Sequence, residues 1–305
     1  MELVRSLAEA MRDSLRSGAV GRMSVPPRET VEDAAGAKFI SMPAVSPDHD
    51  LYINKVATIV TSPGGGRGAT VTSVVPMFSV STGRFHGVLD GATVTNLKCA
   101  AVTALVTDRC AAPESRVLGI IGAGVQARQQ FLGVSAVRDL TEVRIWSRTA
   151  RRTESFARDI AATAAAGGRP VNVVVCGSAE QASRGVDVLS TATTSVAPLP
   201  ISAHLPAHAH VNCMGAHTTR SRELPDSLLR SGVIIVEDLR TAVAEAGESH
   251  AGAVELDVLA GPGGEEFARR RTVFASVGCA YLDLITCAHL VSQGAGTLTA
   301  AALAS

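Results

Sequence analysis

Apolar and polar residues follow two different patterns along this chain, and the change comes near residue 113. Apolar positions 3, 4, 7, 11 and 15 have helical spacing, which predicts an amphipathic first helix. Short strands separated by turn signals are predicted next, at residues 39–42, 52–61, 70–78 and 87–90. A helical pattern runs from Thr93 to about Cys110, where Pro113 closes it. These residues predict an antiparallel, hairpin-rich α+β domain.

After residue 113, apolar strand patterns alternate with helical stretches. A last strand is predicted at 272–276, and a final helix runs from about Ala280 to Ala302. Such alternation is typical of a doubly wound parallel sheet, so we predict an α/β protein with a Rossmann-type domain beside the α+β domain. The earlier strands of this sheet are expected at 117–121, 142–146, 171–175, 186–191, 210–214 and 233–236.

The first strand of the predicted parallel sheet leads into a glycine-rich turn. Val117–Ile121 is a continuous apolar run, and residues 122–127 have the form G-x-G-x-x-A. Gly122 would allow the tight turn, and Gly124 would let a pyrophosphate approach the backbone. The helix after the turn would point its N-terminal amides at the phosphates. With the strand at 142–146, these residues have the length of one βαβ unit, which predicts a dinucleotide site.

The residues after the second strand bear on which dinucleotide is bound. NAD-binding sites usually place an Asp or Glu there, to accept the ribose 2′-hydroxyl. Here the strand ends in Trp146, Ser147, Arg148 and Thr149 without a carboxylate. A guanidinium between two hydroxyls suits a 2′-phosphate. The cofactor is therefore predicted to be NADP(H), with NAD(H) as the alternative.

The charge balance and the composition exclude several classes of partner. The 305 residues include 28 Lys and Arg, 28 Asp and Glu, and 3% aromatic residues. A chain without net charge and with few stacking side chains does not suit nucleic acid or an anionic membrane surface. No apolar run reaches 18 residues, and the first helix lacks a signal-peptide core. We expect a cytoplasmic protein with a small-molecule substrate, no nucleic acid and no membrane partner.

The six cysteines and eight histidines show no spacing typical of metal ligands. No C-x-x-C pair occurs, and most cysteines have apolar neighbours, which predicts core residues. His204, His208 and His210 are expected to be loop histidines, because no carboxylate or thiol lies near them in the sequence. We therefore predict no metal. The 28 basic residues include only three lysines: Lys38, Lys55 and Lys98.

Several short motifs recur in a fixed order along nearly the whole chain: Met42–Ala44, Lys55, Val88–Gly91, Ala100–Ala104, Gly122–Ala127, Ile145–Thr149, Arg222–Leu224 and Phe274–Gly278. As an ordered set, they resemble the ornithine cyclodeaminase and mu-crystallin family. The resemblance implies a substrate-binding and dimerisation domain formed by residues 1–113 together with 277–305, a dinucleotide-binding domain at 114–276, and a homodimer.

The resemblance also implies roles for individual residues. Arg28 and Lys55 would contact the α-carboxylate of the substrate, Val277 would line the substrate, and Thr70 would approach the cofactor. The residues that would line the dinucleotide are Val125, Gln126, Ser147, Arg148, Thr149, Thr191, Met214, Arg220 and Ser276.

Two departures from the family pattern affect the expected reaction. Lys98 stands where the family commonly has Arg, so a charge is kept but a bidentate fork is lost. His217 stands where cyclodeaminases have an Asp that pairs with the ammonium groups of the substrate. The mu-crystallin branch, which resembles an NADPH-dependent ketimine reductase, also lacks that Asp and shares W-x-R-T. Both departures favour a reductase.

The predicted function is therefore NADPH-dependent reduction of a 2-carboxy imine, such as pyrroline- or piperideine-2-carboxylate. Arg28 and Lys98 would hold the carboxylate. His217 is a candidate acid for the imine nitrogen, because histidine titrates near neutrality, and Lys55 is the rival acid. Three alternatives stay open: an ornithine or lysine cyclodeaminase with recycled NAD, an amino-acid or opine-type dehydrogenase, and a ligand-binding protein without turnover.

Overall fold

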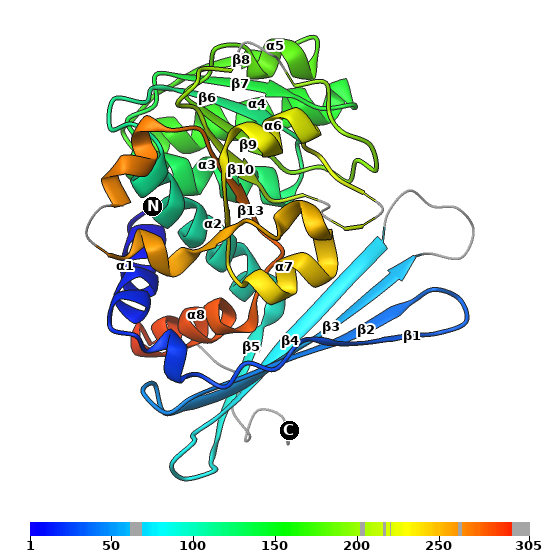
Figure 1. The fold of residues 1–305 in the computed structure, drawn as a ribbon, viewed down its shortest axis with the longest axis vertical. Coiled ribbons are helices and arrows are strands. Elements are labelled where there is room, and N and C mark those ends of the chain that lie inside the picture. The colour runs from blue at the N-terminus through cyan, green and yellow to red at the C-terminus, as the bar shows by residue number, and fades with distance from the viewer. Residues whose placement is uncertain (62–68, 202–204, 216–217, 220, 262–263, 295–305) are drawn as a thin grey trace. The chain divides into compact units, whose positions relative to one another are not determined.

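The chain packs into two units in the structure, which is a computed structural model (Figure 1). It describes residues 1–305 except 62–68, 202–204, 216–217, 220, 262–263 and 295–305. One unit contains residues 1–12 and 99–278, and the other contains residues 13–98 and 279–305. Helices α1 (Glu2–Arg16) and α2 (Gly91–Cys110) contribute residues to both units. The division by function expected at residues 113 and 277 stays a prediction.

The unit of residues 13–98 and 279–305 is built on an antiparallel sheet with the order β1-β2-β3-β4-β5. All the predicted strands of this part are confirmed, and β1 adds an edge strand directly after Arg28. The register between β4 and β5 shifts between Met77 and Phe78. The strands are β1 (Glu29–Glu32), β2 (Lys38–Ser46), β3 (Leu51–Thr61), β4 (Ala69–Phe78) and β5 (Phe85–Asp90), and a short helix η1 (Val20–Arg22) precedes them.

One face of this antiparallel sheet is covered by helix α8 (Ala280–Ser292) (Figure 1). Side chains alternate between the faces of a strand, so every second residue of β3 points towards the helix. Ile53 and Lys55 are such residues, and Leu284 and Cys287 of α8 belong to the same buried cluster as Ile53. We call this the inner face, and the opposite face the outer face.

The unit of residues 1–12 and 99–278 is built on an eight-stranded parallel sheet with the order β12-β11-β13-β10-β9-β6-β7-β8. The order β8-β7-β6-β9-β10 is that of a doubly wound sheet, so the predicted fold class is confirmed. The strands are β6 (Val117–Ile121), β7 (Glu142–Trp146), β8 (Asn172–Val175), β9 (Val188–Thr191), β10 (His210–Cys213), β11 (Val233–Val236), β12 (Val254–Glu255) and β13 (Thr272–Ala275).

Helices cover both faces of the parallel sheet. Phe131 of α3 and Phe156 of α4 lie in one buried cluster with Ile120 and Val143. Ala182 of α5, Leu228 of α6 and Ala242 of α7 lie in the other. The helices are α3 (Val125–Val137), α4 (Ala150–Ala166), α5 (Ala179–Ser183), α6 (Asp226–Ser231), α7 (Leu239–Ala246), η2 (Glu248–His250), η3 (Leu256–Leu259) and η4 (Gly264–Arg269).

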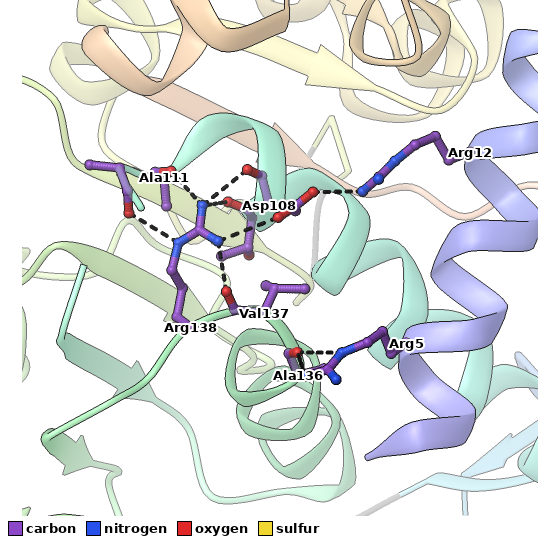
Figure 2. A network of polar contacts seen from close by, with 9 residues as sticks. Arg5, Arg12, Asp108, Ala111, Ala136, Val137 and Arg138 are labelled. Carbon is purple, nitrogen blue, oxygen red and sulfur yellow. Dashed lines mark hydrogen bonds and ion pairs between the residues drawn. The ribbon is translucent and has the colours of Figure 1, made fainter. Parts of the chain in front are cut away.

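A buried arginine closes the C-terminal end of α2 (Figure 2). Arg138, directly after α3, donates hydrogen bonds to the carbonyl oxygens of Thr107, Asp108 and Ala111 at 2.6–3.1 Å. The last carbonyls of a helix have no partner within the helix, so a guanidinium with several donors satisfies them together. Arg12 pairs with the carboxylate of the same Asp108 at 2.6 Å, which joins the C-terminal half of α1 to this network.

The prediction of loop histidines is wrong for His210. This residue begins β10, and its ring is fully buried between the hydroxyl of Thr272 and the amide oxygen of Asn212. Burial lowers the pKa of His210 to about 3, so the ring is neutral at physiological pH. Among the described residues, no group of three or more His, Cys, Asp or Glu side chains is placed to bind a metal ion.

Candidate active site

The turn between β6 and α3 contains two glycines that are needed for different reasons. Gly122 has a φ of 124°, and a Cβ built on it would lie 2.4 Å from the carbonyl oxygen of Ala192. Its own amide donates to the carbonyl of Trp146 at 2.9 Å. Any other residue at this position would be strained, and would also clash with the backbone. Gly122 is therefore required by the turn itself.

Gly124 has an ordinary backbone and open space beside it. Its φ is −102°, it begins α3 without a side-chain cap, and no atom lies within 4 Å of a Cβ built on it. The next residue, Val125, is 61% exposed although it is apolar. Uncapped amides at the start of a helix are suited to an anion. This end of α3 thus has no side-chain cap and has open space beside Gly124, while Ala127 packs in the core.

The segment after β7 presents the predicted 2′-phosphate residues. The hydroxyl of Ser147 is 2.7 Å from that of Thr153, and Thr149 begins α4. Arg148 is exposed between them, and no hydrogen bond or ion pair ties it to any part of the chain that the structure describes. The first turn of α4 contains no acidic residue. A guanidinium in this setting is available to an anionic ligand.

A buried carboxylate, Glu223, joins the segments that follow β9 and β10. It accepts hydrogen bonds from the hydroxyl of Thr191 at 2.8 Å, the amide of Thr193 at 2.6 Å and the amide of Gly215 at 2.9 Å. Burial raises the pKa of Glu223, and the bonds from Thr193 and Thr191 oppose that rise. Sequence reasoning used Glu223 only as part of a family motif, and the structure shows that it fixes Thr191.

Glu237 has the same role beside β13. This buried residue follows β11, and its carboxylate accepts hydrogen bonds from the hydroxyl of Ser276 and from the amides of Val277 at 3.1 Å and Gly278 at 3.3 Å. Sequence reasoning missed it. The available signal was its position, because an acidic residue directly after the apolar run 233–236 lies at the end of a buried strand.

The predicted dinucleotide residues gather at one edge of the parallel sheet. Thr191 ends β9, Met214 follows β10, and Ser276 follows β13. Backbone bonds link them in series: the amide of Met214 donates to Thr191, and that of Ser276 to Cys213. Because the strands are parallel, their carboxyl ends share this edge with the β6–α3 turn, where such folds bind ligands. Arg220 and His217 lie outside the described residues.

Two of the predicted substrate residues meet in the other unit, on a carboxylate that sequence reasoning missed. The ammonium of Lys55 on β3 lies 2.6 Å from one oxygen of Asp283 on α8, and that of Lys98 on α2 lies 3.1 Å from the other oxygen. All three side chains are buried. Burial by itself would raise the pKa of Asp283, but the charges of Lys98 and Lys55 more than offset this and leave it below the ordinary value.

Arg28 directly precedes β1. The first residue of that strand, Glu29, pairs with Ser41 of β2, and the next residue of β2, Met42, pairs with Lys55. Arg28 is half-buried. Thr70 lies in β4, opposite Val60, and its side chain is outside the described part.

Comparison with known proteins points in one direction. The chain matches the model of the ornithine cyclodeaminase/mu-crystallin family over residues 1–295. It is 31% identical to the ketimine reductase mu-crystallin of Rattus norvegicus over 282 residues, which are 91% of this chain and 87% of the relative. It is 30% identical to the Delta(1)-pyrroline-2-carboxylate/Delta(1)-piperideine-2-carboxylate reductase of Azospirillum brasilense, over 93% of this chain and 88% of that one.

Two solved structures have the same fold along nearly the whole chain. One is the Thermococcus litoralis Delta(1)-pyrroline-2-carboxylate reductase in complex with NADH and L-proline, with a TM-score of 0.85, 25% identity and coverage of 97% of this chain and 96% of that one. The other is a lysine cyclodeaminase, with a TM-score of 0.84, 25% identity and coverage of 96% and 87%. With its glycine turn, its buried lysine pair and these relatives, the chain belongs to the ornithine cyclodeaminase/mu-crystallin family.

Proposed function

We propose that this protein is a reductase that transfers hydride from a nicotinamide dinucleotide to the C=N carbon of a 2-carboxy imine, giving the corresponding amino acid. Cyclic imines such as pyrroline- and piperideine-2-carboxylate are the proposed substrates. The observation that carries the proposal is the identity of 30–31%, along nine tenths of the chain, to relatives named as ketimine and pyrroline/piperideine-2-carboxylate reductases.

The carboxyl edge of the parallel sheet fits the dinucleotide. The space beside Gly124 and the uncapped start of α3 suit a pyrophosphate, with Val125 and Gln126 in the first turn of that helix. Thr191, Met214 and Ser276 follow neighbouring strands, where the nicotinamide end would lie. A reduced nicotinamide supplies the hydride in this class of reaction. The buried carboxylates Glu223 and Glu237 hold the segments that would line it.

NADP(H) is the proposed preference among nicotinamide cofactors. It is supported by the exposed guanidinium of Arg148 between the hydroxyl residues Ser147 and Thr149, and by the lack of an acidic residue at this strand end. A dianionic 2′-phosphate would gain charge-assisted hydrogen bonds there, whereas a 2′-hydroxyl would offer no charge to the guanidinium.

The substrate carboxylate is assigned to the basic residues of the antiparallel sheet and α2. Lys55 and Lys98 are buried, and Arg28 directly precedes β1 of the same sheet. Together they would fix the carboxylate, and so hold C2 of the imine in a single position for hydride transfer. Val277 is proposed to contact the substrate ring.

A proton must reach the imine nitrogen, because hydride adds readily only to the protonated imine. We propose His217 as the acid, since histidine is the side chain whose ordinary pKa lies near neutrality. Lys55 is the alternative acid. Its ammonium is 2.6 Å from the Asp283 carboxylate, a contact that fixes the side chain and supports its role in holding the substrate carboxylate.

Cyclodeamination is the competing activity, because the lysine cyclodeaminase structure matches this fold almost as well as the pyrroline-2-carboxylate reductase does. It would consume ornithine or lysine, release ammonia and leave the dinucleotide unchanged overall. His217 does not supply the permanent negative charge that pairs with a second ammonium group, so the reductase is favoured.

The outer face of the antiparallel sheet supports a homodimer. Its exposed apolar side chains include two cross-strand pairs: Val56 with Val74, and Val31 with Phe39. Exposed apolar patches of this kind usually mark protein–protein interfaces. A second copy of the chain is the proposed partner, because a two-fold axis would bring identical patches together.

The cytoplasm is the proposed location. All six cysteines are free thiols, and five of them are buried. Free thiols without disulfides are typical of proteins in reducing compartments. No helix in the described ranges is long and apolar enough to cross a membrane. Cell fractionation with an antibody against the protein would test the location, and recovery in a secreted fraction would contradict it.

One set of assays tests the function directly. Oxidation of NADPH, and separately of NADH, is followed by absorbance with pyrroline- and piperideine-2-carboxylate, and ammonia is assayed with ornithine and lysine. We expect consumption of NADPH with the cyclic imines and no ammonia. Ammonia released from ornithine or lysine without net cofactor change would replace the reductase by a cyclodeaminase. A reaction that needs an open-chain 2-oxo acid and an amine would indicate a dehydrogenase instead.

A further inference from the structure

The buried carboxylate of Glu237 accepts hydrogen bonds from three successive residues after β13. Its Oε1 accepts from the hydroxyl of Ser276 and from the amide of Gly278 at 3.3 Å, and its Oε2 accepts from the amide of Val277 at 3.1 Å. Glu237 directly follows β11, which is the neighbour of β13 in the parallel sheet. The segment 276–278 is therefore folded around a carboxylate at the carboxyl edge of the sheet.

The backbone of this segment is turned so that two of its amides point at one group. Gly278 has a φ of 76°, in the left-handed region that favours glycine. Successive amides turned together form a concave site for an anion, and the side chain of Glu237 occupies this one. The amide of Ser276 donates instead to the carbonyl of Cys213 at 3.0 Å. Each of the three backbone N–H groups of the segment is thus used within the protein.

The hydroxyl of Ser276 has its direction set by the same carboxylate. A serine hydroxyl has one proton and two lone pairs, whereas a carboxylate only accepts, so the proton of Ser276 lies in its bond to Glu237. Ser276 is partly exposed. With every polar hydrogen of the described residues 276–278 used inside the protein, what this segment offers to a ligand is lone pairs. It suits a ligand group that donates.

The proposed cofactor carries such a group at its reactive end. The carboxamide of nicotinamide has an NH₂ that donates and a carbonyl that accepts. A segment that offers acceptors selects the NH₂ and disfavours the carbonyl. Ser276 also follows a strand at the edge to which Thr191 and Met214 belong, and the nicotinamide end was assigned to this edge above.

We propose that Glu237 is a positioning residue of the cofactor site: by taking the proton of Ser276, it makes this hydroxyl an acceptor for the NH₂ of the nicotinamide carboxamide. This inference rests on the proposed function and deepens it. Such a bond would restrain rotation of the nicotinamide ring about its bond to the ribose, which helps to keep one geometry for hydride transfer.

The first test compares the binding of NADP⁺ with that of its 3-acetylpyridine analogue, in which a methyl group replaces the NH₂ and the carbonyl is kept. Calorimetry measures both affinities without any substrate. We expect the native protein to bind NADP⁺ about three- to tenfold more tightly, the range of one hydrogen bond. The thionicotinamide analogue, which keeps the NH₂, should bind about as tightly as NADP⁺. Equal affinities for NADP⁺ and the acetylpyridine analogue would overturn the inference.

Variants of Ser276 test the acceptor itself. Ser276→Ala should lose the preference: its affinity for NADP⁺ falls by about three- to tenfold, and its affinity for the acetylpyridine analogue changes by less than about twofold. Ser276→Thr keeps a hydroxyl and should keep the preference. If Ser276→Ala weakens both dinucleotides equally, Ser276 has only a structural role and the inference is wrong.

Glu237→Gln tests the control of the hydroxyl. The NH₂ of glutamine can donate to Ser276, which would leave the serine proton for a ligand, so the preference for NADP⁺ should fall. Added to Ser276→Ala, the same change should leave the ratio of the two affinities as it is, because the hydroxyl is already gone. An equal effect of Glu237→Gln in both backgrounds would refute the inference. If Glu237→Gln does not fold, the two Ser276 variants still test the acceptor.

Ser231→Ala is the matched control for Ser276→Ala. Ser231 ends α6 just before β11 begins, so it lies at the opposite edge of the parallel sheet. Its hydroxyl donates to the carbonyl of Leu228 at 3.1 Å and accepts from Arg271 at 2.9 Å. We expect both affinities to stay at their native values. Loss of the preference in this variant would show that the ratio reports general damage, and would remove the support for Ser276.

The binding data separate this inference from the proposed function. A preference for the carboxamide that is lost in Ser276→Ala supports the inference even if no imine is reduced. Reduction of imines by a protein that binds both dinucleotides equally would support the proposed function and refute the inference. The substrate iminium N–H is the competing donor. A higher KM for the imine in Ser276→Ala, with the carboxamide preference unchanged, would assign Ser276 to the substrate and refute the inference.

Discussion

Arg148 is exposed at the end of β7, and no Asp or Glu occurs between residues 143 and 153. We predict that Arg148→Gln raises the KM for NADPH about 10- to 100-fold, the loss expected for a charge-assisted bond to phosphate. The KM for NADH should change by less than about threefold, because a 2′-hydroxyl forms no ion pair with the guanidinium. Steady-state kinetics with both cofactors measure this.

Arg151→Gln is the control for the cofactor prediction, since Arg151 is exposed in the first turn of α4, three residues further along the chain. It should leave the ratio of the two KM values near that of the native enzyme. If Arg148→Gln raises both KM values equally, Arg148 does not select the 2′-phosphate.

His210 makes the stability of this protein sensitive to acid. Burial lowers its pKa to about 3, well below the 6.5 expected in the unfolded chain. Between these values the unfolded state binds the extra proton, so the free energy of unfolding falls as the pH falls, by about 1.4 kcal/mol per pH unit from this group. Above pH 6.5 the ring is neutral in both states and the effect disappears.

Urea unfolding from pH 4.5 to 7 tests this prediction. His210→Gln removes the titrating ring, and its free energy of unfolding should fall less steeply with acid than that of the native protein. His86→Gln, at an exposed position of β5, should keep the native slope. Equal slopes for the native protein and His210→Gln would show that His210 is not the group responsible.

At the scale of elements, the β6–α3 turn contains two glycines with different predicted roles. Gly122 is predicted to affect stability, and Gly124 is predicted to affect cofactor binding. We predict that Gly122→Ala lowers the free energy of unfolding by about 2 kcal/mol or more, because its φ of 124° disfavours a side chain and Ala192 blocks the Cβ. Gly124→Ala should leave stability within about 0.5 kcal/mol, because the backbone is ordinary and the space is open.

For cofactor binding we expect a loss in Gly124→Ala, the variant whose stability should hardly change. Gly124→Ala would fill the space assigned to the pyrophosphate, and we expect the NADPH affinity to fall about tenfold or more. Thermal unfolding and fluorescence titration of NADPH measure the two effects. Native affinity in Gly124→Ala would mean that the dinucleotide does not pass this turn.

The bounds of most elements could be predicted from local pattern. The strands at 117–121, 142–146 and 233–236 agree with the structure, as does the start of α8 at Ala280. Such runs are recognisable because the periodicity of apolar residues and the turn residues are local properties. Two-residue β12 was missed, because so short a strand has no period of its own.

At the scale of the whole molecule, the outer face of the antiparallel sheet predicts the oligomeric state. Val56→Asp with Val74→Lys would place charges on two paired strands without altering the inner face. We expect light scattering to show a monomer for this double variant and a dimer for the native protein. Val175→Asp, at a position of similar exposure on β8, should remain dimeric. A native protein that is monomeric would contradict the proposed interface.

What the sequence by itself determined is the local chemistry of this protein. The glycine turn, the basic end of β7, the alternation of strands and helices and the ordered family motifs all lie in short segments. Each is specified by neighbouring residues, so the fold class, the family and a nicotinamide cofactor could be predicted from it. The candidate site residues, such as Gly124, Arg148 and Lys55, stay predictions.

Only the tertiary structure decided which distant segments pair through polar side chains and which strands are neighbours in a sheet. It sets β13 between β10 and β11, although β11 comes first in the chain. It also brings Asp283 to Lys55 across 228 residues, and Glu223 to Thr191. The sequence around an acidic residue does not show whether its side chain faces water or pairs with a buried lysine. Its partner is selected by the packing of the complete core, because burial makes an unpaired charge too costly to keep.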